Sequence, residues 1–157
     1  MPLAVWLREL TDAWHARPHG EHVRLDVQAD AVVRASPALL RQLLDNLINN
    51  ALKYGRLDKP VTVTLERQGA SIAISVADEG PGVAPADQSS LFQPFFRTAS
   101  ARRSGVAGTG LGLAVAARIA AGFGRGAALH GPRRRRSSFH ADVARLRGRS
   151  QRAGRRR

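Results

Sequence analysis

Three polar residues recur at helical spacing in the segment PALLRQLLDNLINNALKY, residues 37–54. Asn46, Asn50 and Lys53 stand at i, i+4 and i+7, so a helix would place them in one row beside its apolar face. Each asparagine inside a helix costs roughly half a kcal/mol relative to alanine. Two amide oxygens and an ammonium group in one row suit a hydrated Mg²⁺ ion and its phosphates. Taken alone, a solvated polar face is the slightly better interpretation.

A carboxylate ends the segment SIAISVAD, residues 71–78. Strand periodicity turns Asp78 toward the same face as the apolar residues of that segment, and a buried carboxylate costs several kcal/mol unless it is hydrogen-bonded. The exocyclic amine of an adenine would be a suitable donor. Gly80 and Gly82 follow, and both would let the backbone pass close to a flat ligand. The alternative is an aspartate that caps the turn after the strand.

A glycine-rich segment, GTGLGLAVAARIA, occupies residues 108–120. Gly108, Gly110 and Gly112 precede or open an expected helix, where unpaired N–H groups and the helix dipole favour phosphate. The segment is not a P-loop, because no lysine follows the glycines at the required position. It is not a Rossmann turn either, because the preceding RTASARRSGVA is not strand-like. A flexible hinge is the alternative.

The elements that must position these groups follow from hydrophobic periodicity. A Ser36–Pro37 pair marks the start of the clearest helix, as an N-cap followed by proline in the first turn. A loop rich in glycine, proline, serine and arginine is expected from about residue 79 to residue 108. Helices are expected over residues 3–16, 37–54 and 109–121, and strands over residues 22–28, 61–65, 72–76, 127–130 and 137–143. This order predicts a two-layer α/β sandwich whose mixed, mostly antiparallel sheet packs against helices.

Composition and charge narrow the class of protein. The 157 residues are enough for one domain, and the absence of cysteine excludes disulfides, thiolate metal sites and a cysteine nucleophile. No apolar run approaches the roughly 18 residues of a membrane span, so we expect a soluble, intracellular chain. The net charge is +13, and residues 133–157 contribute eleven arginines against the single acid Asp142. No aromatic residue follows Phe139, so we expect a disordered basic tail without specific nucleic-acid binding.

The segments LLDNLINNALKYG, DEGPGV, LFQPFFR and GTGLGLAVAARI occur in this order along the chain. Together they resemble the four nucleotide-binding boxes of the catalytic ATP-binding domain of sensor histidine kinases. Gyrase B subunits, heat-shock chaperone ATPases and mismatch-repair ATPases share that superfamily. The resemblance implies a Bergerat-type fold over residues 1–145, with residues 146–157 as the tail. It also implies ATP and Mg²⁺ as cofactors and a mobile ATP lid at about residues 93–108.

The resemblance also implies roles for single residues. Asn50 would coordinate the Mg²⁺ ion, Asn46 would support it, and Lys53 would reach the phosphates, which makes these three the expected catalytic residues. Tyr54 would lie against ribose and adenine, and Asp78 would accept the adenine amine. The other implied nucleotide-binding residues are Gly80, Gly82, Val83, Phe92, Arg97, Gly108, Thr109, Gly110, Leu111, Gly112, Leu113 and Ser138. Of these, Arg97 would meet a phosphate and Ser138 would reach adenine through water, while Phe92, Phe95 and Phe96 would anchor the lid.

The implied activity is transfer of the ATP γ-phosphoryl group to a histidine of a separate dimerisation domain. The implied partners are that domain and a response regulator receiver domain. None of the five histidines here has the sequence setting of a phosphoacceptor. The implied location is cytoplasmic, within a parent kinase that is often anchored in the inner membrane. Two alternatives are a noncatalytic nucleotide-binding module and an anti-sigma-type serine kinase or ATPase of the same superfamily. The last is disfavoured, because Asn46 stands where those enzymes carry a glutamate base.

Overall fold

The computed structural model describes residues 1–69, 71–123, 129–130 and 137–141. Their strands form one five-stranded sheet in the order β1-β2-β3-β5-β4. The strands are β1 Val23–Val27, β2 Val61–Gln68, β3 Ser71–Asp78, β4 Leu129–His130 and β5 Ser137–Ala141. The pair β1 and β2 is parallel, and the other neighbouring pairs are antiparallel. The predicted mixed, mostly antiparallel sheet is therefore confirmed.

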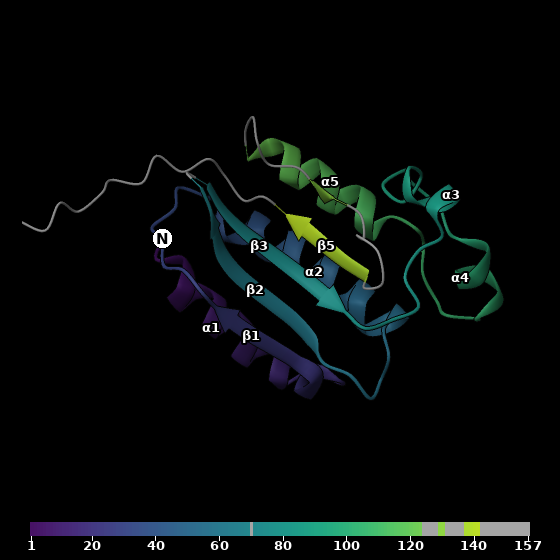
Figure 1. The fold of residues 1–157 in the computed structure, drawn as a ribbon, viewed down its shortest axis with the longest axis horizontal. Coiled ribbons are helices and arrows are strands. Elements are labelled where there is room, and N and C mark those ends of the chain that lie inside the picture. The colour runs from purple at the N-terminus through teal and green to yellow at the C-terminus, as the bar shows by residue number, and fades with distance from the viewer. Residues whose placement is uncertain (70, 124–128, 131–136, 142–157) are drawn as a thin grey trace, which may run out of the picture.

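Three longer helices lie against one face of this sheet, as Figure 1 shows. They are α1 Leu3–His15, α2 Pro37–Tyr54 and α5 Gly112–Gly122. The helix α2 crosses behind β3 and packs side by side with α5. This arrangement is the predicted two-layer α/β sandwich. Among the described residues, no helix is both long and apolar enough to span a bilayer.

The helix α2 is held in place by its cap, its apolar face and a contact to α1. The Ser36 side chain accepts a hydrogen bond from the backbone N–H of Leu39, and Pro37 opens the helix, as predicted. The indole Nε1 of buried Trp14 in α1 donates to Asp45 Oδ1 of α2 over 2.9 Å. The buried apolar residues of α2 are Leu40, Leu43, Leu44, Leu47, Ile48 and Ala51. With one side anchored in the core, α2 presents its polar row beside that buried face.

Two expectations for the second half of the chain were wrong. The helix expected from residue 109 begins at Gly112, because Gly110 has a φ of 75°, which is incompatible with a right-handed helix. The segment expected to be a loop from residue 79 to 108 contains two short helices, α3 Pro85–Gln88 and α4 Ala99–Arg103. The tail at residues 146–157 lies outside the described residues, so its expected disorder stays a prediction.

Candidate functional site

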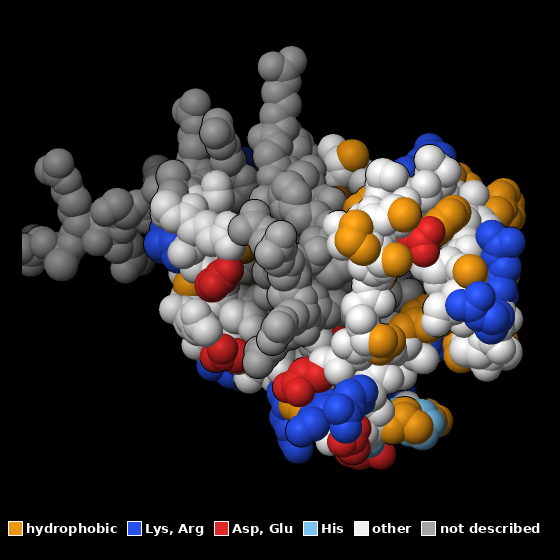
Figure 2. Space-filling view, turned by 45° about the vertical axis from the view of Figure 1, so that its right-hand side comes forward, with side chains coloured by type: hydrophobic (Ala, Val, Ile, Leu, Met, Phe, Trp, Pro, Cys, Tyr) orange, Lys and Arg blue, Asp and Glu red, His pale blue; other side chains and the backbone are white. Residues whose placement is uncertain are grey.

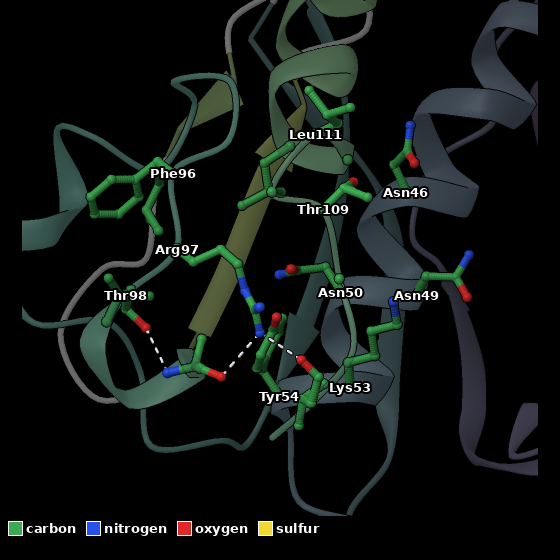
Figure 3. Close-up of a pocket in the computed structure, with 18 of the residues that line it drawn as sticks. Asn46, Asn49, Asn50, Lys53, Tyr54, Phe96, Arg97, Thr98, Thr109 and Leu111 are labelled. Atoms are coloured by element: carbon green, nitrogen blue, oxygen red, sulfur yellow. Dashed lines mark hydrogen bonds between the residues drawn. The ribbon is translucent and has the colours of Figure 1, made fainter. Parts of the chain in front are cut away.

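A cavity of about 700 Å³ lies where the end of α2, the end of β3, α4 and the start of α5 converge. Figure 3 shows polar side chains of α2 on one side of this cavity and the segment from Phe96 to Thr98 on the other. The lining comes from parts of the chain that are far apart in sequence, between Gln42 and Val115. The fold thus assembles one site from all four motifs that the sequence singled out.

The helix α2 supplies one wall of the cavity. All four of its predicted site residues line it, namely Asn46, Asn50, Lys53 and Tyr54. Two further lining residues, Gln42 and Asn49, were missed. Gln42 stands one turn before Asn46, so extending the i, i+4 row backwards would have found it. The amide of Asn49 donates to the backbone oxygen of Asp45 over 2.8 Å, which ties this side chain to its own helix.

Asp78 caps the turn after β3, as the alternative interpretation of this carboxylate predicts, and it also lines the cavity. Its side chain is buried, with 3% exposed, and it lines the cavity from the end of β3. Its Oδ1 atom also accepts a hydrogen bond from the backbone N–H of Gly80 over 2.7 Å, so it caps the following turn. A carboxylate has about four acceptor positions. Capping the turn and binding a ligand are therefore compatible tasks for one residue.

The two glycines after Asp78 have different roles. Gly82 has a φ of 79° and lines the cavity beside half-buried Val83, as predicted. Gly80 is not among the lining residues. A Cβ atom at Gly80 would lie 2.7 Å from both Asp78 Oδ1 and the backbone oxygen of Tyr54. Its lack of a side chain therefore lets the turn pack against the end of α2 and does not open the cavity itself.

The glycine-rich segment forms another part of the cavity wall, close to α2. Its six predicted residues all line the cavity: Gly108, Thr109, Gly110, Leu111, Gly112 and Leu113. Gly110 has to be glycine, because its φ is positive and a Cβ atom would lie 2.8 Å from the backbone of Phe95 and Phe96. A Cβ atom at Gly112 would lie 3.5 Å from Asn46 Oδ1, so the first turn of α5 is next to the polar row of α2. The positive end of the α5 dipole therefore faces the cavity.

The segment predicted to be the lid, at about residues 93–108, is held by cations of the site. The guanidinium Nη2 of Arg97 donates to the backbone oxygens of Ala101 and Val106 over 3.1 and 2.5 Å (Figure 3). Its buried Nε atom has no hydrogen-bond partner among the described residues. Lys53 Nζ of α2 donates to the backbone oxygen of Ala107 over 3.3 Å. Both cations expected at the phosphates thus bind lid carbonyls in this conformation.

The lid also brings residues to the cavity that sequence reasoning missed. They are Thr98, Ser100, Ala101, Ser104 and Val106, with Phe96 predicted only as an anchor. Thr98 caps α4 by accepting from the backbone N–H of Ala101 over 3.1 Å, and Ser104 Oγ donates to the Ala101 oxygen over 2.9 Å. The cap before α4 was a detectable signal for a short helix. Which of its side chains face the cavity is set by tertiary packing.

The three phenylalanines around the start of the lid do not act alike. Phe92 and Phe96 are half-buried and pack against the core, and only Phe96 lines the cavity. Phe95 does not anchor the lid as expected, because 73% of it is exposed and its φ is 64°. Its backbone N–H donates to the oxygen of Gly110 over 3.1 Å, so its backbone joins the two ends of the lid.

Ser138 lies in β5, where it pairs with Ala77 next to Asp78. Its backbone is thus close to the predicted adenine acceptor, and its side chain is outside the described structure. The charged lining residues among those described are Lys53, Arg97 and Asp78. A carboxylate and two cations in one cavity suit a ligand that carries both a base or amine and anionic groups.

Comparison with known proteins finds the same combination of fold and motifs. The sequence profile of the family described as "Histidine kinase-, DNA gyrase B-, and HSP90-like ATPase" matches residues 35–147. The sensor-like histidine kinase SenX3 of Mycobacterium tuberculosis is 40% identical over 99 residues, which are 63% of this chain and 24% of SenX3. The sensor histidine kinase CpxA of Escherichia coli is 42% identical over 80 residues, which are 51% of this chain and 17% of CpxA. The matched part is thus a quarter or less of each relative.

Solved structures agree in fold. The mycobacterial sensor histidine kinase MprB has a TM-score of 0.71 at 22% identity, covering 90% of this chain and 94% of that one. Full-length ShkA in complex with AMPPNP has a TM-score of 0.71 at 27% identity, covering 94% of this chain and 32% of ShkA. The histidine kinase ThkA in complex with the response regulator TrrA has a TM-score of 0.68 at 19% identity, covering 90% of this chain and 40% of ThkA.

Proposed function

The chain belongs to the family of histidine kinase-, DNA gyrase B- and HSP90-like ATPases, as a catalytic ATP-binding domain of the sensor histidine kinase type, and from this premise we propose its reaction. The domain binds ATP with Mg²⁺ and presents the γ-phosphoryl group to a histidine of a separate dimerisation domain. The phosphoryl group then passes to a response regulator. We propose a cytoplasmic location for this domain within a longer kinase.

The observation that carries this proposal is the convergence of the three sequence clusters on one cavity. Asp78 marks the end for the base, because its carboxylate can accept the exocyclic amine of adenine. The first turn of α5 and the ammonium of Lys53 mark the end for the triphosphate, because both favour anions. Tyr54 and Val83 line the space between them and offer apolar surface to the base and ribose.

The oxygen atoms of the α2 row fit a magnesium ion. Asn46 and Asn50 contribute neutral amide oxygens to the cavity, and Mg²⁺ binds hard oxygen ligands together with several waters and substrate phosphates. The only carboxylate among the described lining residues is Asp78, at the end assigned to the base. Mg²⁺ would neutralise charge on the phosphates, with Asn50 as the expected protein ligand. Asn46, next to the first turn of α5, supports the same region.

In this proposal the residues of the chain catalyse transfer by positioning and by electrostatics, as is general for phosphoryl transfer. Asp78 fixes the base, and the row on α2 fixes the phosphates relative to it. Lys53 and Arg97 hold lid carbonyls now, and phosphate oxygens are stronger acceptors for these cations than neutral carbonyls. Binding of the triphosphate would thus exchange the lid contacts for phosphate contacts. An ordered lid would also exclude water from the γ-phosphate.

Hydrolysis is disfavoured by the same geometry. Asn46 lies beside the first turn of α5, where the phosphates are expected, and an amide cannot take a proton from water. Among the described lining residues, the only carboxylate that could act as a base is Asp78, which caps the turn after β3. The isolated chain should therefore bind ATP without steady release of phosphate. Rapid release by the purified chain would favour the ATPase alternative.

Phosphoryl transfer to a supplied acceptor tests the proposal. The chain is mixed with γ-labelled ATP, Mg²⁺ and a panel of dimerisation domains that carry the phosphoacceptor histidine, including that of SenX3. We expect an acid-labile, alkali-stable phosphohistidine on at least one acceptor, and no label when the acceptor histidine is replaced by glutamine. Tight nucleotide binding without transfer to any acceptor would favour a noncatalytic binding module. Absence of any calorimetric heat with ATP and Mg²⁺ would contradict both interpretations.

A further inference from the structure

The turn between α1 and β1 gathers metal-ligating side chains away from the nucleotide site. His19, Glu21 and His22 each offer one ligand atom, and these atoms lie within 4.8 Å of one another. The Nε2 atom of His22 is 3.7 Å from Glu21 Oε1. It is the single group of this kind within the described part of the chain. Histidine side chains from the end of α1 and this turn reach the surface, pale blue in Figure 2.

The backbone that carries these side chains is held in place by contacts with the end of α1. Gly20 is buried, and a Cβ atom there would lie 1.7 Å from the backbone oxygen of Trp14, so the turn is pressed against the end of α1. The backbone N–H of Gly20 donates to Arg17 over 2.9 Å, and that of His22 donates to His19 over 3.2 Å. The three ligands therefore start from Cα positions that are already close. Only side-chain rotations are needed to bring them together.

The neighbouring charged and ligating groups are occupied elsewhere. The Arg17 guanidinium stacks 4.4 Å from the centre of the Trp14 ring and pairs with Asp45 over 3.6 Å. The ring Nε2 of His15 is 3.0 Å from the backbone oxygen of Val23. The positive charge of Arg17 is thus bound to another element, and His15 is a poor candidate for a further ligand. The cluster itself consists of two imidazoles and one carboxylate.

These ligands favour a different class of metal ion than the one proposed for the nucleotide site. Imidazole nitrogen with one carboxylate suits Zn²⁺ and other late first-row ions, whereas Mg²⁺ prefers oxygen ligands only. Ligands of a tetrahedral site with bonds of about 2.0–2.2 Å lie about 3.4 Å apart. The pair formed by Glu21 and His22 is nearly at that separation. The exposed side chain of His19 needs to move by little more than an ångström.

We propose that His19, Glu21 and His22 form a surface site for Zn²⁺, with water completing the coordination. The ion would cross-link the turn that joins α1 to β1. This site does not depend on nucleotide, so its test is carried out without ATP and separately from any test of the kinase reaction.

Calorimetric titration of the full chain with Zn²⁺ tests the proposal. We expect one ion per chain, no competition by Mg²⁺, and a rise in the thermal unfolding midpoint with Zn²⁺ because the ion binds the folded turn. His19→Gln and His22→Gln should each weaken binding by roughly tenfold or more, since one of three protein ligands is lost. His140→Gln is the matched control, and it should leave zinc affinity unchanged. Equal affinity in all variants, or no binding by the unaltered chain, would overturn the site.

Nuclear magnetic resonance of the unaltered chain avoids any dependence on how the variants fold. Addition of Zn²⁺ should shift the ring signals of His19 and His22 and leave those of His140 in place, because the metal binds through imidazole nitrogens. Shifts confined to other histidines would contradict the assignment even if calorimetry registers an ion.

Discussion

At the scale of single residues, Asp78 is the most informative position. Its carboxylate is buried, with 3% exposed, and it both caps a turn and lines the cavity. Asp78→Asn keeps an oxygen that can accept from the Gly80 N–H, so the fold should persist. The new amide NH₂ group would oppose the adenine amine. We expect ATP affinity to fall about tenfold to a hundredfold and the preference over GTP to vanish.

Calorimetry with ATP and GTP, together with thermal unfolding, measures both consequences of Asp78→Asn. An unchanged unfolding midpoint with a lost preference would support the assignment of the base-binding end. A variant that stays folded and still prefers ATP over GTP would show that another group recognises the base.

Asn50 and Asn49 form a matched pair of neighbours that both line the cavity. The amide of Asn49 is bound to the Asp45 backbone, whereas Asn50 stands in the row expected to face the metal. Asn50→Ala should weaken binding of Mg²⁺–ATP by roughly tenfold or more and change metal-free ATP binding much less. Asn49→Ala should have a small effect in both conditions. Equal losses for Asn50→Ala with and without Mg²⁺ would remove Asn50 from the ligand shell.

At the scale of elements, the lid is a small folded unit, held by the Arg97 side chain and by the Thr98 cap of α4. In Arg97→Ala, both bonds to lid carbonyls are lost. Without nucleotide, amide hydrogen exchange across residues 101–107 should then quicken by at least about fivefold, since each lost bond contributes about 1 kcal/mol. The control is Arg103→Ala, an exposed arginine of the same helix α4. Equal exchange in both variants would show that Arg97 does not brace the lid.

We expect the contact between α1 and α2 to affect the stability of the domain more than its affinity for ligand. Asp45 accepts from the Trp14 indole over 2.9 Å and lies 3.6 Å from the Arg17 guanidinium. Asp45→Ala leaves the indole N–H without this acceptor, so the free energy of unfolding should fall by about 1–3 kcal/mol. Urea unfolding measures the loss, with the exposed Asp12→Ala as control. A loss of ATP affinity that exceeds the loss of stability would mean that Asp45 also shapes the site.

Sequence reasoning located the elements whose signals are local. The start of α2 is marked by Ser36 and Pro37, and its apolar face by ordinary helical periodicity, so its bounds were predicted correctly. The start of α5 was placed three residues early, because Gly110 has a positive φ that a run of small and apolar residues does not reveal. The short helix α4 has no apolar face of its own. The anchor role of Phe95 was implied by the family resemblance alone, and the 73% exposure of this residue does not agree with it.

At the scale of the whole molecule, sequence motifs predicted part of the site. They did not predict the lining residues whose positions depend on tertiary packing. The polar row of α2, Asp78 and the glycine-rich segment meet at one cavity as expected. The lid side chains around α4 reach the same cavity only because tertiary contacts fold the segment back over it. No local pattern in the sequence encodes that approach. The function implied by the motifs therefore does not depend on the exact bounds predicted for the helices.

The hydrogen bond from Phe95 to Gly110 has a consequence for how this domain tolerates change. It joins the entry and the exit of the lid, so the intervening segment is a closed loop, with the bonds of Arg97 and Lys53 as further contacts inside it. Lengthening such a loop costs only about 0.6 kcal/mol for each doubling of its length. Insertions between residues 98 and 107 should therefore leave the sheet and the three long helices intact. The length of the lid can thus vary independently of the sheet and helices that hold it.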